Sequence, residues 1–314
     1  MKEFVIVISD GPMGSTTIAS IIGNCNYLTF PLRHLGLNKY LTKEYDLNHP
    51  FCINRLKENI KVYTKPRLQG GRSIQEKDTV TLLDKKINNE IPDLEIKKFS
   101  SILEKYFFIY ELFNKYCIYK EKQKKYDGIV ELATDIQHYQ PSLIQQRYKE
   151  EFKKVRYISL NRNFKNWLNS ICSQRFKKKI KFKYLVIRLS SQIKRNKNYN
   201  SFINKLENNT IISFEHIFEK EFLKKFFLKL NLKKKKNFDK LKFDHYGKLL
   251  EFNEIFQPID DQYYFINKLS FKIIDYAEKY YDNKILRFIL DIIFQISYLK
   301  DYIFYKIRRN PVKR

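Results

Sequence analysis

The chain has 314 residues, 43% of them hydrophobic, and its 26 Phe and 23 Tyr supply enough core for one large domain or a domain with an appendage. Its 61 Lys and Arg outnumber 34 Asp and Glu, giving a formal net charge of +27. This charge favours polyanionic partners, including nucleic acid, anionic lipid and phosphorylated cofactors, and carries no information about the fold. The composition excludes a chain too poor in apolar residues to be globular.

The cysteines stand far apart, with no pair at metal-ligand spacing, so reduced thiols are expected and a disulfide framework is not. They are Cys25, Cys52, Cys117 and Cys172. The N-terminus enters an apolar segment at once, without the charged region and cleavage site of a signal peptide. We therefore expect a cytoplasmic protein.

Apolar periodicity predicts strands that alternate with helices up to about residue 232. The expected strands are Phe4–Ser9, Lys61–Thr64, Gly128–Leu132, Val155–Leu160 and Thr210–Phe214. The expected helices are Thr17–Asn24, Phe99–Lys125, Pro141–Phe152, Phe164–Arg175 and Phe218–Leu230. This order favours the α/β class, with a parallel central sheet flanked by helices.

The alternation stops near Leu232. The run "LKKKKNFDKLKFD" that starts there is expected to be a basic surface segment. Tyr263–Tyr281 and Ile285–Ile307 are expected to be two long helices. We predict a sheet domain over residues 1–235 and a helical C-terminal extension over 236–314, packed on that domain. The segment 33–98 carries little pattern.

The first expected strand is followed by "GPMGSTT", residues 11–17. Backbone amides there and at the start of the next helix would converge on one small volume and form an anion site. The glycines let the main chain approach closely, and the hydroxyls of Ser15, Thr16 and Thr17 add donors. The alternative is an ordinary strand-to-helix turn. The Gly-Lys of P-loop ATPases and GTPases is missing.

A second set of polar residues follows the strand Val155–Leu160. Arg162 comes just after its carboxyl end, where open α/β sheets bind ligands, and its planar fork suits a phosphate. Ser170 lies two turns into the next helix. The alternative is an arginine at the sheet edge and a helix serine bonded to its own backbone.

Together these motifs resemble the sulfotransferases that use 3′-phosphoadenosine 5′-phosphosulfate (PAPS). "GPMGSTT" resembles their 5′-phosphosulfate loop, and Arg162 with Ser170 resembles their 3′-phosphate segment. The stretch "NTIISFEHIFEKEFLKKFFLKLNL", residues 209–232, resembles the strand, acidic residue and helix found late in that family. The three motifs agree in order and spacing over residues 1–232.

The resemblance implies a P-loop nucleotide-binding fold, PAPS as cofactor, no metal, and transfer of a sulfuryl group to an acceptor hydroxyl or amine. It assigns the 5′-phosphosulfate to Gly11, Gly14, Ser15, Thr16 and Thr17, and the 3′-phosphate to Arg162 and Ser170. Such a transfer depends mainly on positioning and on neutralising charge.

The chain departs from the family at Met13, which aligns with the Lys or Arg of the loop. That cation neutralises charge on the leaving phosphate. Three explanations stay open: another cation replaces it, the chemistry is slow, or the chain is a non-catalytic relative. The candidate cations are Arg33, Lys65, Arg67 and Arg72.

The expected catalytic base is His138, because the cytosolic branch of the family has a base histidine at a comparable position and histidine accepts protons near neutral pH. The alternative is a surface histidine. Other branches use a glutamate, for which Glu44 and Glu131 are candidates, while His34 and His49 are weaker ones. Glu215 is expected to be an orienting or capping group.

Two further segments suggest partners. Residues 175–198 carry ten basic side chains and no acid, so they form a solvated helix face or attract an anionic cofactor or acceptor. Nucleic acid is a minor option because no interleaved aromatic pattern is present. The helix Ile285–Ile307 is a packed terminal helix or, with "KIRRNPVKR" at its end, lies on an anionic membrane. Its charges disfavour a transmembrane span.

The leading hypothesis is thus a cytoplasmic sulfotransferase that acts on a glycan or a lipid-linked precursor. A P-loop kinase of the nucleoside type is the alternative enzyme, since "DGPMGSTT" also resembles a shortened nucleotide-binding loop. A non-catalytic binding protein is the third hypothesis.

Overall fold

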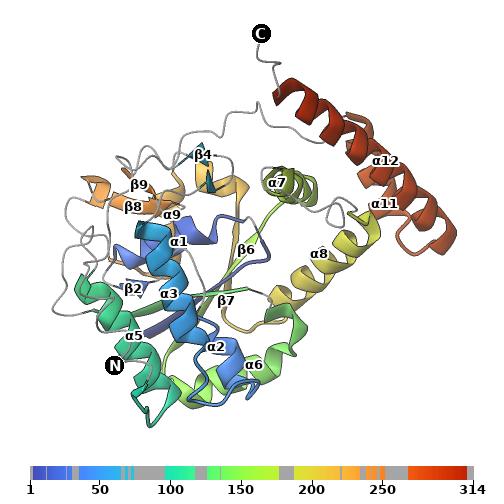
Figure 1. Cartoon of the computed structure of the whole chain (residues 1–314). Coiled ribbons are helices and arrows are strands. Elements are labelled where there is room, and N and C mark those ends of the chain that lie inside the picture. Colours follow the sequence, from blue (N-terminus) through green and yellow to red (C-terminus); the bar gives the residue numbers. More distant parts are fainter. Residues whose placement is uncertain are drawn as a thin grey trace. The chain divides into compact units, whose positions relative to one another are not determined.

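The structure is a computed structural model (Figure 1). It describes residues 3–11, 13–25, 27–29, 35–64, 68–69, 72–73, 96–116, 126–134, 136–176, 187–219, 221–233, 238–240, 242–245, 248–251 and 268–309. The chain forms two compact units, the first from Met1–Asn161 and Phe202–Pro258, the second from Arg162–Ser201 and Ile259–Arg314. The division into residues 1–235 and 236–314 stays a prediction.

The first unit is built on a five-stranded sheet in the order β2, β5, β1, β6, β7, with every neighbouring pair parallel. The strands are β1 (Glu3–Ile8), β2 (Tyr27–Thr29), β5 (Gly128–Ala133), β6 (Val155–Asn161) and β7 (Asn209–Ser213). All residues of β1 and β5 are buried, as expected of strands covered on both faces. The predicted α/β class with a parallel central sheet is confirmed.

Helices flank the sheet of the first unit (Figure 1). They are α1 (Ser15–Gly23), α2 (Leu37–Leu41), α3 (Phe51–Thr64), α5 (Ile102–Tyr116), α6 (Pro141–Glu151) and α9 (Phe222–Leu230), with the 3-10 helices η2 (Ile136–His138), η4 (Glu215–Phe218) and η5 (Phe238–Lys240). Two antiparallel pairs complete it: β3 (Leu68–Gln69) with β4 (Arg72–Ser73), and β8 (Lys242–His245) with β9 (Lys248–Glu251). Helix α1 is buried from Thr17 to Gly23 because it contacts β2, β5 and β8.

The strand register defines two edges of the sheet. Ile8 at the end of β1 pairs with Ala133 of β5 and with Ser159 of β6. The carboxyl ends of these three strands therefore lie together, at what we call the carboxyl edge. Their amino ends form the amino edge, where Glu3 pairs with Gly128.

Two sequence-based predictions are wrong in this unit. Lys61–Thr64, predicted as a strand, is the last turn of α3, which buries Cys52, Ile53 and Leu56 at helical spacing. Its β-branched and aromatic residues imitate a strand over a short window. The basic run from Leu232 is not only surface, because Phe238 is buried and packs edge-on against the ring of Phe227, 5.1 Å away.

The second unit contains the remaining helices, α7 (Phe164–Phe176), α8 (Leu189–Asn204, as far as Ser201), α11 (Lys268–Lys279) and α12 (Lys284–Arg309). The two helices predicted at the end of the chain are α11 and α12. They pack against each other, and the hydroxyls of Ser270 and Ser297 are 2.6 Å apart. Within the described ranges, no helix has the length and apolarity that crossing a membrane requires.

Candidate functional site

The loop between β1 and α1 leaves the carboxyl edge of the sheet. Gly11 and Gly14 have φ angles of 81° and 80°, a left-handed conformation that glycine adopts without a Cβ penalty. Gly14 is the N-cap of α1 and has no side chain to cap the helix. The first-turn amides of a helix lack carbonyl partners inside it, so those of α1 present donors to the loop.

Close packing also requires glycine at position 14. A Cβ there would lie 3.0 Å from the ring of Phe214 and 3.1 Å from the side chain of Ile217. Both neighbours belong to the segment that follows β7. The late sequence motif and the loop motif therefore meet in the fold, at Gly14.

The predicted hydroxyl donors of the loop differ in their surroundings. Ser15 and Thr16 are partly exposed at the start of α1. Thr17 is buried and already interacts with another part of the protein. Ser15 and Thr16 are thus the hydroxyls best suited to reach a ligand.

Ser9, at the end of β1, adds a donor that the sequence analysis did not assign. Its amide donates a hydrogen bond of 3.1 Å to the carbonyl of Ala133, and its side chain is 1% exposed. Its Oγ is buried without a hydrogen-bond partner among the residues that the structure describes. A buried hydroxyl normally has a partner, so this one is a candidate donor for a ligand. The neighbouring Asp10 is also buried and already interacts within the protein.

Met13 aligns with the loop cation of the sulfotransferases that the sequence resembles. Its side chain is fully buried, and its amide donates to the carbonyl of Gly11 at 2.9 Å. The position is thus filled by packing. Of the proposed replacement cations, Arg33, Lys65 and Arg67 lie outside the described residues, and only the backbone of Arg72, in β4, is described.

The predicted base, His138, ends the 3-10 helix that follows β5, the strand beside β1, and its side chain is exposed. Near it in sequence, Tyr139 donates a hydrogen bond to Glu44 at 2.7 Å, and Glu44 pairs with Lys39 at 2.5 Å. The Lys39 ammonium and then the Tyr139 hydroxyl hold the pKa of Glu44 below its usual range. Glu44 is therefore a weaker base than an isolated glutamate.

Glu131, the other candidate glutamate, is buried in β5. It accepts hydrogen bonds from the amide of Leu35 at 3.0 Å and from the hydroxyl of Tyr110. Burial raises its pKa to about 7, against the opposing effect of the Tyr110 hydroxyl and the amides of residues 35–37. This carboxyl anchors the turn before α2, and it is not exposed to an acceptor.

The other candidates have structural contacts or lie outside the description. The ring of His49 stacks on Tyr45 with 3.8 Å between centroids, and its Nδ1 accepts a hydrogen bond from the amide of Phe51. His34 is outside the described residues. Glu215 accepts a 2.7 Å hydrogen bond from the hydroxyl of Ser213 at the end of β7.

Arg162 and Ser170 belong to the second unit. Arg162 directly follows the last residue of β6, the strand that neighbours β1, and Ser170 lies midway along α7. Both are partly buried, and Arg162 already has a partner within the protein. The basic segment 175–198 falls partly outside the described residues.

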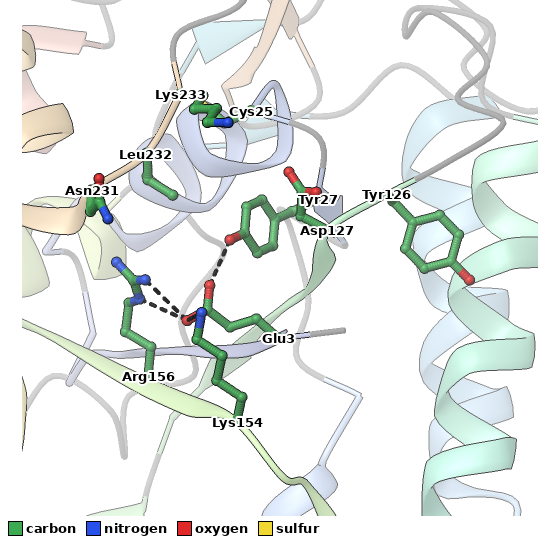
Figure 2. Close-up of a pocket in the computed structure, with 10 residues that line it drawn as sticks. All are labelled: Glu3, Cys25, Tyr27, Tyr126, Asp127, Lys154, Arg156, Asn231, Leu232 and Lys233. Atoms are coloured by element: carbon green, nitrogen blue, oxygen red, sulfur yellow. Dashed lines mark hydrogen bonds and ion pairs between the residues drawn. The ribbon is translucent and has the colours of Figure 1, made fainter. Parts of the chain in front are cut away.

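A cavity of about 430 Å³ lies at the opposite, amino edge of the sheet (Figure 2). Its lining includes Glu3, whose carboxylate receives the hydroxyl of Tyr27 at 2.6 Å and the guanidinium of Arg156 at 3.0 Å. Lys154 lies 3.5 Å from the same carboxylate. Arg156 also donates to the carbonyl of Leu230. The Glu3 carboxylate is thus engaged by two cations and a hydroxyl, and cavity size alone does not identify this edge as the functional site.

A metal site finds no support in the described ranges, where no three His, Cys, Asp or Glu residues are grouped to hold an ion. The fold and the loop define an α/β protein with a candidate anion site at the carboxyl edge of a parallel sheet.

Comparison with known proteins adds one distant likeness. No family model matches the chain, and no curated protein matches it. A solved sulfotransferase domain from the curacin biosynthetic pathway is similar in structure, with 19% sequence identity, 76% of this chain and 77% of that chain covered, and a TM-score of 0.46. A likeness this distant carries no argument about function, which has to be argued from the loop.

Proposed function

We propose that the chain is a sulfotransferase that uses PAPS and acts on a hydroxyl or amine of a glycan or lipid-linked acceptor. The observation that supports this best is the loop after β1. This loop has two glycines in the left-handed conformation and leads into a helix that has no side-chain cap. The amides at the helix start and the buried hydroxyl of Ser9 are therefore hydrogen-bond donors at the carboxyl edge. That edge is where parallel α/β sheets bind ligands. A cytoplasmic location is part of the proposal.

The residues present fit a phosphosulfate group, which offers only acceptor oxygens to the amide and hydroxyl donors of the loop. When bound, PAPS supplies the sulfuryl group that is transferred. The loop residues Gly11, Gly14, Ser15, Thr16 and Thr17 would hold and orient the 5′ end, and the sequence resemblance assigns the 3′-phosphate to Arg162 and Ser170.

His138 is the proposed base. It follows the strand next to β1, and its exposed imidazole is free of the burial that encloses Glu131. In this role an imidazole nitrogen takes the proton of the acceptor hydroxyl or amine. His138→Gln should lower turnover about 100-fold or more while leaving nucleotide affinity unchanged.

The packing of Met13 favours a second candidate, a relative that binds the nucleotide and transfers sulfate slowly or not at all. Without the loop cation, turnover is expected to be lower by about 100-fold to 1000-fold. Because Met13 is buried, Met13→Lys would place a charge in the core and is a poor rescue variant. A P-loop kinase stays the alternative enzyme and would need magnesium and ATP.

Isothermal titration with 3′-phosphoadenosine 5′-phosphate, which we call the desulfo nucleotide, tests the proposal. We expect saturable binding without magnesium, and affinity for adenosine 5′-monophosphate about tenfold or more lower, because it lacks the 3′-phosphate. Arg162→Ala and Ser170→Ala should each lose affinity. Arg188→Ala removes the same charge at an exposed position before α8 and should change affinity little.

Three outcomes would overturn the proposal. They are no binding by a folded wild-type protein, equal affinity for the two nucleotides, and magnesium-dependent phosphoryl transfer from ATP. Equal losses in Arg162→Ala and Arg188→Ala would indicate attraction by net charge alone.

A further inference from the structure

Helix α12 in the second unit has two unlike faces. Its inner face contacts α11 and includes Leu290, Phe294 and Tyr298, all buried. Its outer face carries large apolar side chains in contact with solvent, of which Ile285 is 76% exposed and Ile296 is 66% exposed. Contiguous apolar surface of this kind usually marks an interaction site.

The outer apolar residues follow one another at steps of three or four. They include Ile285, Phe288, Ile292, Ile296, Leu299 and Ile303. At 3.6 residues per turn this spacing forms one continuous stripe, and at 1.5 Å per residue the stripe is about 27 Å long. We call these six residues the α12 stripe.

Basic residues border the α12 stripe. Lys284 and Lys300 are exposed, and their helical positions lie on opposite sides of the stripe. Asp291 is turned away, because its carboxylate accepts hydrogen bonds from the amide and the hydroxyl of Ser190 at the start of α8. The surface thus combines apolar side chains with positive margins.

We propose that the α12 stripe binds the surface of an anionic lipid bilayer, with the helix lying parallel to the membrane. Apolar side chains enter the boundary between head groups and acyl chains, while the bordering lysines meet lipid phosphates and carboxylates. The formal net charge of +27 adds attraction to the same surface.

A second copy of the chain fits this face less well. Lys284 and Lys300 on one stripe would approach equal charges on its copy. The positions that flank a narrow helix–helix seam, such as Phe288 and Ile293, are apolar and exposed. A wide apolar face is typical of helices that lie in a membrane interface.

Co-sedimentation of the full chain with lipid vesicles tests the proposal. One vesicle is phosphatidylcholine alone, and in the other about a third of the lipid is phosphatidylserine, at about 0.15 M salt. We expect the chain to bind the anionic vesicles and to bind the neutral vesicles at least about tenfold more weakly. The double variant Ile292→Ser, Ile296→Ser keeps the charge and should lose about tenfold or more of the anionic binding.

Leu228→Ser is the matched control. Leu228 is 74% exposed on α9, which belongs to the first unit, and it is not part of the α12 stripe, so vesicle binding should not change. Undiminished binding by the double variant would mean adhesion by surface lysines and would overturn the proposal. So would equal binding to both vesicles, or no binding. A wild-type dimer that the double variant converts to a monomer in sedimentation velocity would assign the stripe to a second copy instead.

Discussion

The two edges of the central sheet use their polar groups in opposite ways. At the amino edge, the carboxylate of Glu3 receives Tyr27, Arg156 and Lys154, and these four residues line part of the cavity beside it. At the carboxyl edge, the loop after β1 presents helix amides and the hydroxyl of Ser9. A ligand at the amino edge has to break existing interactions, whereas one at the loop supplies missing acceptors. The helix amides and the Ser9 hydroxyl therefore favour the carboxyl edge as the binding edge.

Two buried glutamates of the sheet, Glu3 and Glu131, also differ in the groups that surround them. Glu3 faces a guanidinium, while Glu131, in the described part of the chain, accepts hydrogen bonds from a hydroxyl and backbone amides. Both belong to the sheet, one in β1 and one in β5. Their substitutions should therefore affect stability in different ways.

The largest effect is expected from Glu3→Ala. It leaves Arg156 without its carboxylate in a mostly buried place, which should lower the free energy of unfolding by about 3 kcal/mol. Urea unfolding measures it. Glu150→Ala, which breaks the exposed pair with Arg147, should change the free energy of unfolding little, because solvent screens exposed ion pairs. Similar losses in both variants would contradict the account of the amino edge.

Next is a pH effect at Glu131. Its pKa is raised from 4.5 to about 7 in the folded protein, so the folded state favours the protonated carboxyl. Its contribution to stability is fully present below pH 4.5 and falls by about 3 kcal/mol as the pH rises through 7. Glu131→Gln should abolish this part of the pH dependence in urea unfolding between about pH 5 and 8. Parallel stability profiles of wild type and variant would refute the raised pKa.

A smaller loss is expected from Gly14→Ala. A side chain at a φ of 80° is strained, and the new Cβ would press on Phe214, so about 1–3 kcal/mol of stability should be lost. The loop would also shift, lowering affinity for the desulfo nucleotide about tenfold or more. Gly36→Ala is the control: Gly36 has the same φ, and its Cβ would clash with the ring of Phe51. Gly36→Ala should lose stability and keep its affinity for the desulfo nucleotide. Equal losses of affinity in the two variants would contradict a binding role for the loop.

The smallest effects compare two buried hydroxyls. Tyr27→Phe removes a hydrogen bond to a buried carboxylate and should cost about 1–2 kcal/mol. Ser9→Ala removes a hydroxyl without a partner in the described part of the chain, so the free energy of unfolding should change by about 0.5 kcal/mol or less. Thermal unfolding of both variants measures the difference, and a loss in Ser9→Ala that matches Tyr27→Phe would show that the hydroxyl has a partner.

Sequence patterns predicted the central strands well, because residues 4–8 and 157–160 are buried on both faces and their strands end at polar turns. Short or amphipathic elements were missed. Strand β2 has only three residues, and α2 has five, too few to show a period. Residues 61–64, at the end of α3, look like a strand when they are considered alone. The helical spacing of apolar residues becomes visible only when the window extends ten residues back, to Phe51.

Only part of the candidate site could be read from the sequence. The loop is local, so its glycines and hydroxyls form a recognisable pattern. The burial of Met13 depends on packing in the folded protein, which cannot be predicted from the residues next to it in the sequence. Glu3 and Arg156 are 153 residues apart, and parallel pairing alone brings them together. Ser9 had a visible signal, a polar residue directly after a buried strand.

The affinity of the desulfo nucleotide for Ser9→Ala and Tyr27→Phe, measured side by side by isothermal titration, tests most directly that the carboxyl edge is the binding edge. Each variant loses one buried hydroxyl, one at each edge of the sheet. We predict that Ser9→Ala weakens binding about fivefold to tenfold and that Tyr27→Phe changes it by about twofold or less. Weaker binding in Tyr27→Phe with unchanged binding in Ser9→Ala would contradict the account and assign the nucleotide to the cavity at the amino edge.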